Sequence, residues 1–111
     1  MKSKQELIDR VLVELGVIGA GQTAAAEDVE LITSEIEPVM SDLATRNIYS
    51  WGDPDEYDED AFIHLAKITA NSLARAYGIE PDDGKRLYAE SRLRLLQTVV
   101  LSGQNQSVEY Y

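Results

Sequence analysis

The sequence predicts an all-α protein in which four helices form one bundle-like domain. Apolar residues recur every three or four positions in four separate stretches, which is the period of an amphipathic helix. Capping residues or glycines flank these stretches, and 111 residues with 44% hydrophobic content suffice for a single core. We therefore expect a helical domain over residues 1–102, with an irregular insert between its second and third helices. An extended C-terminal arm over 103–111 is expected to be flexible or ordered by a partner.

The first helix is predicted over residues 3–15. Ser3 and Glu6 have the spacing of a capping box, and Gly16 follows the last apolar position of the stretch. The glycines that follow invite comparison with a phosphate-binding loop. That pattern needs a lysine after the last glycine and a strand before the first, and Gly21 is followed by glutamine. A turn between two helices is the better interpretation.

The second helix is predicted over residues 24–46, with Thr23 as its N-cap. Pro38 lies inside this stretch and removes one backbone donor, so we expect a kink or a break near Glu37. Asn47 is a suitable residue for the position after the helix. The outward side of this helix is expected to be acidic.

The insert after the second helix is the least regular part of the chain. Residues 48–51 suit a short extended segment, and six of the eight residues 53–60 are acidic. A calcium loop that began at Asp53 would need glycine at its sixth position and glutamate at its twelfth. Those positions hold Asp58 and His64, so we expect a solvated loop or a docking point for a basic partner surface.

The third and fourth helices are predicted over residues 59–77 and 83–102. Gly78 ends the third, Asp82 or Asp83 caps the fourth, and Gly103 ends it. The helical stripes together predict a core that includes Leu12, Leu15, Ile32, Ile36, Leu43, Phe62, Leu65, Leu73 and Leu95.

Composition and charge exclude several classes of function. Ten Lys and Arg against twenty Asp and Glu give a net charge of −10, which disfavours tight binding to nucleic acid or to anionic lipid. No cysteine is present and His64 is the one histidine, so we expect no metal, no cofactor and no Cys- or His-based catalysis. No membrane helix or secretory signal is expected. An enzyme that uses the Asp58 and Asp60 carboxylates is the least favoured hypothesis.

Charged and aromatic residues outside the core predict sites of contact with partners. Four of the ten cations lie on the fourth helix, opposite in sign to the acidic insert. They would pair within the subunit or with a neighbouring copy, or they are ordinary surface charge. This interface set comprises Lys85, Arg86, Arg92, Arg94, Asp53, Asp55, Glu56 and Asp58. The arm would contact a partner through Gln104, Val108, Tyr110 and Tyr111, because tyrosines favour interfaces.

A family pattern is carried by several short pieces in order. Residues 12–23 read LVELGVIGAGQT and are followed by AED at 26–28. Residues 42–48 read DLATRNI, with Trp51 and then DPD at 53–55 after them. This succession resembles the small head-to-tail adaptor proteins of tailed bacteriophages, the connectors that stabilise packaged DNA beneath the portal.

The third predicted helix extends the likeness. It contains LA at 65–66, ANSLA at 70–74 and YG at 77–78, similar to the third helix of that family. The resemblance spans about residues 5–97, and the order and spacing of the pieces carry it.

The resemblance implies a structural virion protein with no enzymatic activity. Members form a ring of twelve copies under the portal protein, extend the DNA channel and offer a platform to the next neck or tail protein. Double-stranded DNA would pass through without specific binding, and the arm would reach toward the portal. The location would be the virion neck, and the host cytoplasm during assembly. The alternative is a small acidic helical binding module or DNA mimic that acts on a basic partner.

Overall fold

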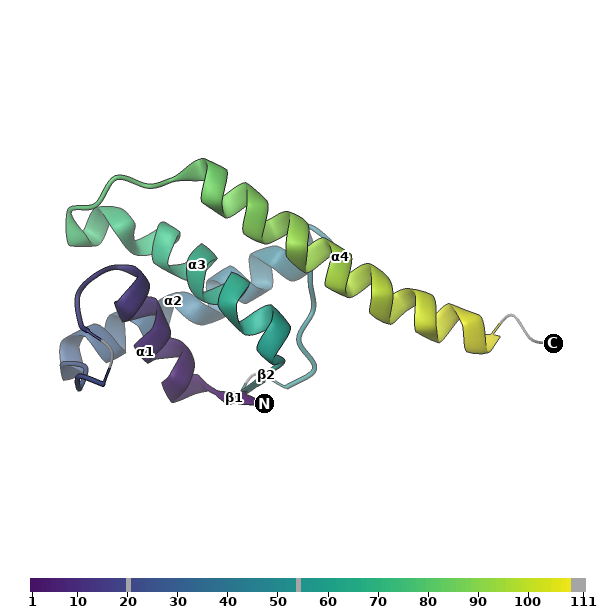
Figure 1. Ribbon diagram of the computed structural model, residues 1–111, viewed down its shortest axis with the longest axis horizontal. Helices are drawn as coiled ribbons and strands as arrows, with labels where there is room; N and C mark the ends of the chain where they lie inside the picture. Colours follow the sequence, from purple (N-terminus) through teal and green to yellow (C-terminus); the bar gives the residue numbers. More distant parts are fainter. Residues whose placement is uncertain (20, 54, 109–111) are drawn as a thin grey trace.

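The computed structural model describes residues 1–19, 21–53 and 55–108, and for residues 99–108 the backbone alone. Four α-helices dominate this part of the chain, so the all-α prediction is confirmed at the level of fold class. Figure 1 shows α1, α2 and α3 gathered at one end and α4 running along them and beyond. The helices are α1 (Lys4–Glu14), α2 (Ala26–Thr45), α3 (Glu59–Leu73) and α4 (Asp83–Val108), with a 3-10 turn, η1 (Ala74–Tyr77), after α3.

Helix α1 begins where the sequence predicts. The Ser3 hydroxyl accepts from the Glu6 backbone N–H at 3.2 Å, and the Glu6 carboxylate accepts from the Ser3 backbone N–H at 3.2 Å. This capping box satisfies two donors that the first turn of a helix leaves open. Gly16 follows the helix with a φ of +74°, a left-handed conformation that glycine adopts without strain.

Helix α2 differs from its prediction at its start and at its middle. The helix begins at Ala26 because the Ala25 carbonyl accepts from the Val29 N–H at 3.1 Å, so Thr23 is not its N-cap. The helix also continues through Pro38 without a break. Pro38 and Ser34, whose carbonyl loses its helical donor, are both exposed, so water can satisfy that carbonyl.

The insert between α2 and α3 contains a strand that the sequence did not predict. Strand β2 (Glu56–Tyr57) pairs antiparallel with β1 (Lys2–Ser3), with Lys2 opposite Tyr57 and Ser3 opposite Glu56. The predicted extended segment at 48–51 is a loop instead, and its Ile48 side chain is fully buried. Tyr57 is also fully buried, so the acidic segment is fixed to the globule at its middle.

Helix α3 is central, because it packs against α1, α2 and α4. Alanines at its buried positions let these neighbours approach closely. Gly78 ends the following 3-10 turn with a φ of +71°, as predicted. The Asp82 carboxylate then caps α4 by accepting from the Lys85 backbone N–H at 3.1 Å.

The predicted core is confirmed at every position but one. Leu95 is 54% exposed, whereas Leu93 is fully buried. The inward side of α4 carries the small Ala89 and the charged Glu90 beside Leu93, so the most apolar stripe of the sequence is not the buried one. The buried positions of the prediction are Leu12, Leu15, Ile32, Ile36, Leu43, Phe62, Leu65 and Leu73.

The end of α4 also departs from its prediction. Gly103 does not end the helix, which continues to Val108. A single glycine inside a helix costs only about 1 kcal/mol relative to alanine, so it weakens a helix without ending it. The long axis of the molecule, 54 Å against 26 and 21 Å for the other two, runs along this extension.

Candidate functional site

The acidic segment, residues 53–60, lies at the surface where β2 leads into α3. The carboxylates of Asp53, Asp55, Glu56 and Asp58 are all exposed, as expected. Lys4 on α1 pairs with Asp55 at 3.3 Å, and the Asp53 side chain accepts from the Asp55 backbone N–H at 2.9 Å. The ion pair holds the segment against the N-terminal end of α1, and the hydrogen bond tightens the turn within the segment.

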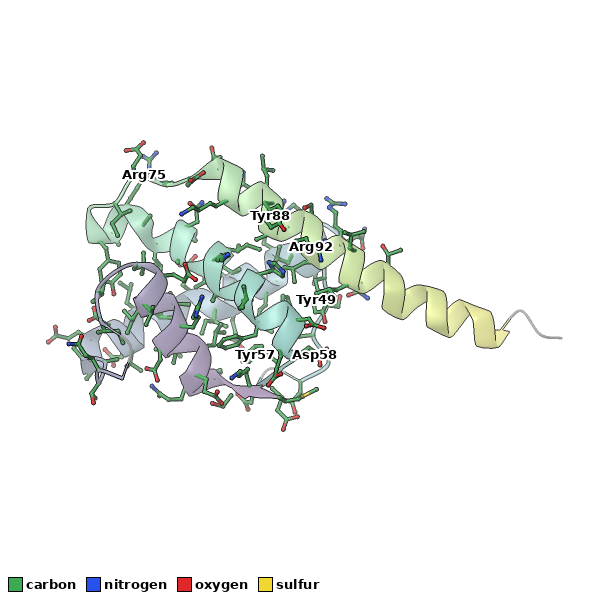
Figure 2. All side chains as sticks on the ribbon, in the orientation of Figure 1. Tyr49, Tyr57, Asp58, Arg75, Tyr88 and Arg92 are labelled. Atoms are coloured by element: carbon green, nitrogen blue, oxygen red, sulfur yellow. The ribbon has the colours of Figure 1, made fainter. Side chains whose placement is uncertain are left out.

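A groove borders the acidic segment. One part encloses about 560 Å³ between Met1, Tyr49, Leu96 and the carboxylate-rich start of α3. A neighbouring part of about 370 Å³ is lined by Trp51 as well as Tyr49, whose rings lie 4.5 Å apart between centroids. The Tyr49 hydroxyl donates to Asp58 at 3.4 Å (Figure 2). The groove therefore combines negative charge with an aromatic floor.

The four cations of α4 do not form one surface. Arg86 faces inward and pairs with Glu90 at 3.0 Å, and Glu90 also pairs with Arg46 of α2 at 2.9 Å. The Glu90 side chain is only 7% exposed. Burial alone would raise the pKa of the Glu90 carboxyl, but hydrogen bonds from Arg46 and Arg86 outweigh it and hold the pKa below the ordinary value. Arg86 thus stabilises the fold, whereas Lys85, Arg92 and Arg94 are exposed.

A second surface, the α3–α4 patch, joins cations and apolar side chains. It comprises Lys85, Tyr88, Arg92 and Leu95 of α4 with Ile63 and Lys67 of α3. The α4 members are spaced by three, four and three residues, which places them along one side of a helix. Tyr88, Leu95 and Ile63 are 60%, 54% and 40% exposed.

His64 of α3 lies beside Tyr88 of α4, where the two helices of the α3–α4 patch meet. Its ring lies 6.5 Å from that of Tyr88, between centroids, in an edge-on arrangement. Burial lowers the pKa of His64, and the nearby charges of Lys67 and Arg92 lower it further, against a smaller opposite effect of Asp60. The cations of both helices therefore act on the same point. A pocket of about 500 Å³ at the end of the patch is lined by Arg10, Lys67, Lys85 and Tyr88, with Glu14, Asp82 and Gly84.

The predicted contact residues of the arm lie outside the part of the structure that describes side chains. The backbone of Gln104 and Val108 belongs to α4, and Tyr110 and Tyr111 lie outside the described residues altogether. Figure 1 shows that this end of α4 stands clear of the other helices. The Gln97 side chain, which accepts from the Ser50 backbone N–H at 2.9 Å, ties α4 to the globule before the helix leaves it.

Within residues 1–19, 21–53 and 55–108, no three His, Asp or Glu side chains gather as they would around a metal ion. In the same ranges no helix is both long enough and apolar enough to cross a membrane.

The chain matches no family model, no curated protein and no solved structure. Function is therefore argued from the surfaces themselves.

Two features of these surfaces escaped prediction from the sequence. The first is the buried pairing of Arg46 with Glu90, which joins residues far apart in the chain. The second is the exposure of Tyr88, since the spacing of apolar residues does not show that this side of α4 faces outward. The sequence signals only the neighbouring pair, because Arg86 and Glu90 are four residues apart and can pair on one helix, whereas no local spacing points to Arg46.

Proposed function

We propose that this chain is a structural assembly protein, a head-to-tail adaptor that forms a ring beneath the portal of a tailed bacteriophage. In this proposal the helices form a bundle-like adaptor, and the ring of about twelve copies extends the DNA channel. It presents a platform to the next neck or tail protein and has no catalytic role. The protein would reside in the virion neck, and in the host cytoplasm during assembly.

The free end of α4 is the observation that carries the proposal. From Thr98 to Val108 the helix continues for eleven residues, or about 16 Å, past its contact with Ser50. A helix of this length is unstable in water without packing against something else. An element that leaves its own globule in this way supports docking on another protein, as the resemblance implies for the arm.

The two charged surfaces support assembly through further contacts. The acidic segment and the α3–α4 patch are opposite in sign, and both are exposed. An acidic wall would also suit a channel through which DNA slides, because it repels phosphate.

Deletion of residues 104–111 tests the proposed role of the arm. The shortened chain is expected to keep its helical circular dichroism and its unfolding transition, since the described tertiary contacts of α4 precede the deletion. Co-sedimentation with the portal protein encoded in the same genome should fall relative to the full chain. Absence of the full chain from virions, together with no association with the portal, would overturn the proposal.

The alternative function is a small acidic binding module or DNA mimic. The exposed carboxylates of the acidic segment favour it, because an array of negative charges can imitate a phosphate backbone. Affinity capture distinguishes the two. Recovery of a basic DNA-binding protein would favour the mimic, and recovery of portal or neck proteins would favour the adaptor.

A further inference from the structure

We infer that the acidic segment of one copy docks on the α3–α4 patch of a second copy, in a head-to-tail contact. The inference rests on the proposed assembly function and names the surfaces that would join neighbouring subunits.

The α3–α4 patch has the composition of a protein interface. It presents three cations, Lys67, Lys85 and Arg92, and none of them forms an ion pair among the residues that the structure describes. Tyr88 lies between Lys85 and Arg92 on α4, and Leu95 lies about one turn beyond Arg92; both side chains are more than half exposed. Large side chains of this kind, surrounded by charge, are typical of the centre of a binding surface. Figure 2 shows Tyr88 and Arg92 about one turn apart on α4.

The acidic segment offers the complementary charge. Six carboxylates lie within eight residues, and Lys4 with Asp55 is the one ion pair that the described residues form there. The adjoining groove adds apolar surface, since Met1 at its edge is 74% exposed. A partner that fits this segment must carry both cations and apolar groups, and the α3–α4 patch carries both.

The two surfaces do not pair with each other within one chain. Among the described residues, no carboxylate of the acidic segment forms an ion pair with Lys67, Lys85 or Arg92. The segment is also fixed by the pairing of β2 with β1. We therefore place the contact between two copies. Because the two surfaces differ, it is a heterologous contact, which generates rings or open filaments.

Disulfide trapping tests the contact directly, because the natural chain contains no cysteine. One population carries Arg92→Cys and the other Glu56→Cys, with tags of different size. After mixing under mild oxidation, we expect a mixed disulfide dimer that forms about tenfold faster than in the control pair. The control combines Glu56→Cys with Arg75→Cys, an exposed arginine of η1, the turn that follows α3 (Figure 2). Equal trapping rates for the two pairs would overturn the inference.

Charge reversal provides a second, independent test. Lys85→Glu/Arg92→Glu makes the patch acidic, and Glu56→Lys/Asp58→Lys makes the segment basic. Neither pair is expected to unfold the chain, since both cations are exposed and Asp58 makes no side-chain capping bond. Asp58→Lys does remove the 3.4 Å hydrogen bond from the Tyr49 hydroxyl, so the unfolding transition of each variant is measured beside its association. In sedimentation velocity each variant alone should associate about tenfold more weakly than the natural chain, and a mixture of the two should regain association. Arg75→Glu, at an exposed position outside the patch and with the same change in net charge as Arg92→Glu alone, should leave association unchanged, whereas Arg92→Glu alone should weaken it.

The outcomes separate this inference from the proposed function. If the reversed variants still form complete rings on the portal, the docking pair is wrong while the adaptor role stands. If the mixture regains self-association but the natural chain does not bind the portal protein, the docking pair is supported and the adaptor role is wrong. Failure of the mixture to associate better than either variant would also overturn the docking pair.

Discussion

At the scale of single residues, Glu90 is a nearly buried carboxylate that pairs with two arginines. Its carboxylate is nearly excluded from water and accepts from Arg46 of α2 and Arg86 of α4. Arg46 also pairs with Asp42 at 2.7 Å, so its guanidinium joins two carboxylates and its pKa is raised. A buried charge without a partner is costly, so this cluster fixes the position of α4 against α2.

Replacement of Glu90 by glutamine should lower the free energy of unfolding by about 2 kcal/mol at neutral pH. This loss is smaller than the ~3–5 kcal/mol expected when one partner of a fully buried ion pair is removed. The reason is that the Arg46 side chain is 40% exposed and still pairs with Asp42. Since the pKa of Glu90 is lowered by folding, its contribution is present above the ordinary value of 4.5 and is lost as the pH falls through the folded-state pKa. Urea denaturation should therefore show the two proteins converging in acid. Glu30→Gln, at an exposed position, should change stability by less than about 0.5 kcal/mol.

A second residue-scale contact joins the start of α2 to the end of η1. The Tyr77 hydroxyl donates to Asp28 at 2.8 Å, and burial together with this bond raises the pKa of Tyr77 to about 12. The neutral phenol is the stabilised form, so the contribution is complete below pH 10 and is lost as the pH rises through 12. Tyr77→Phe should cost about 1 kcal/mol at neutral pH and show a smaller loss of stability in alkali. A variant as stable as the natural chain, with the same alkaline profile, would contradict this.

At the scale of elements, α4 has an unusual distribution of side chains. Its inward side holds Ala89, Glu90 and Leu93, while Leu87, Tyr88 and Leu95 face outward and are more than half exposed. A helix normally turns its apolar stripe toward the core. Here the small Ala89 allows close approach of α3, and the ion pairs of Glu90 join α4 to α2. The larger apolar residues remain available for other contacts.

Leu93 and Leu95 should therefore respond differently to the same truncation. Leu93→Ala leaves a cavity in the core and should cost about 2–4 kcal/mol of unfolding free energy. Leu95→Ala should change stability by less than about 0.5 kcal/mol, because that side chain is already in water. Thermal or chemical denaturation of both variants measures this directly. The reverse order would show that α4 buries the other stripe.

Some features of the helices can be predicted from the sequence alone, and others cannot. Local signals were read correctly where a cap or a left-handed residue is required, as at Ser3, Gly16 and Gly78. The buried side of α4 could not be read, because the pair of Arg46 with Glu90 depends on how α2 and α4 meet. The exposed acidic segment was predicted from its charge density. The sequence did not show that Arg86 of α4 faces inward while Lys85 and Arg92 face outward, because this depends on how α4 packs in three dimensions.

At the scale of the whole molecule, the net charge of −10 conceals an uneven surface. The acidic segment and the α3–α4 patch have opposite signs, so copies of this chain repel on average and attract at one pair of surfaces. Average repulsion keeps a subunit soluble and disfavours wrong contacts, while local complementarity sets the orientation of the right one. Association of two copies through such a pair of surfaces should then depend on the salt concentration, because salt screens the attraction between their charges.

Self-association of the natural chain should weaken as ionic strength rises, because the screening length falls from about 10 Å at ~0.1 M salt to about 3 Å at ~1 M. The Lys85→Glu/Arg92→Glu variant should behave oppositely. Its reversed patch repels the acidic segment, so salt relieves that repulsion and leaves the exposed Tyr88 and Leu95 to associate. Sedimentation velocity over a series of salt concentrations compares the two. If the natural chain instead associated more strongly in high salt, burial of the apolar stripe, and not the pairing of charges, would be the dominant source of affinity between copies.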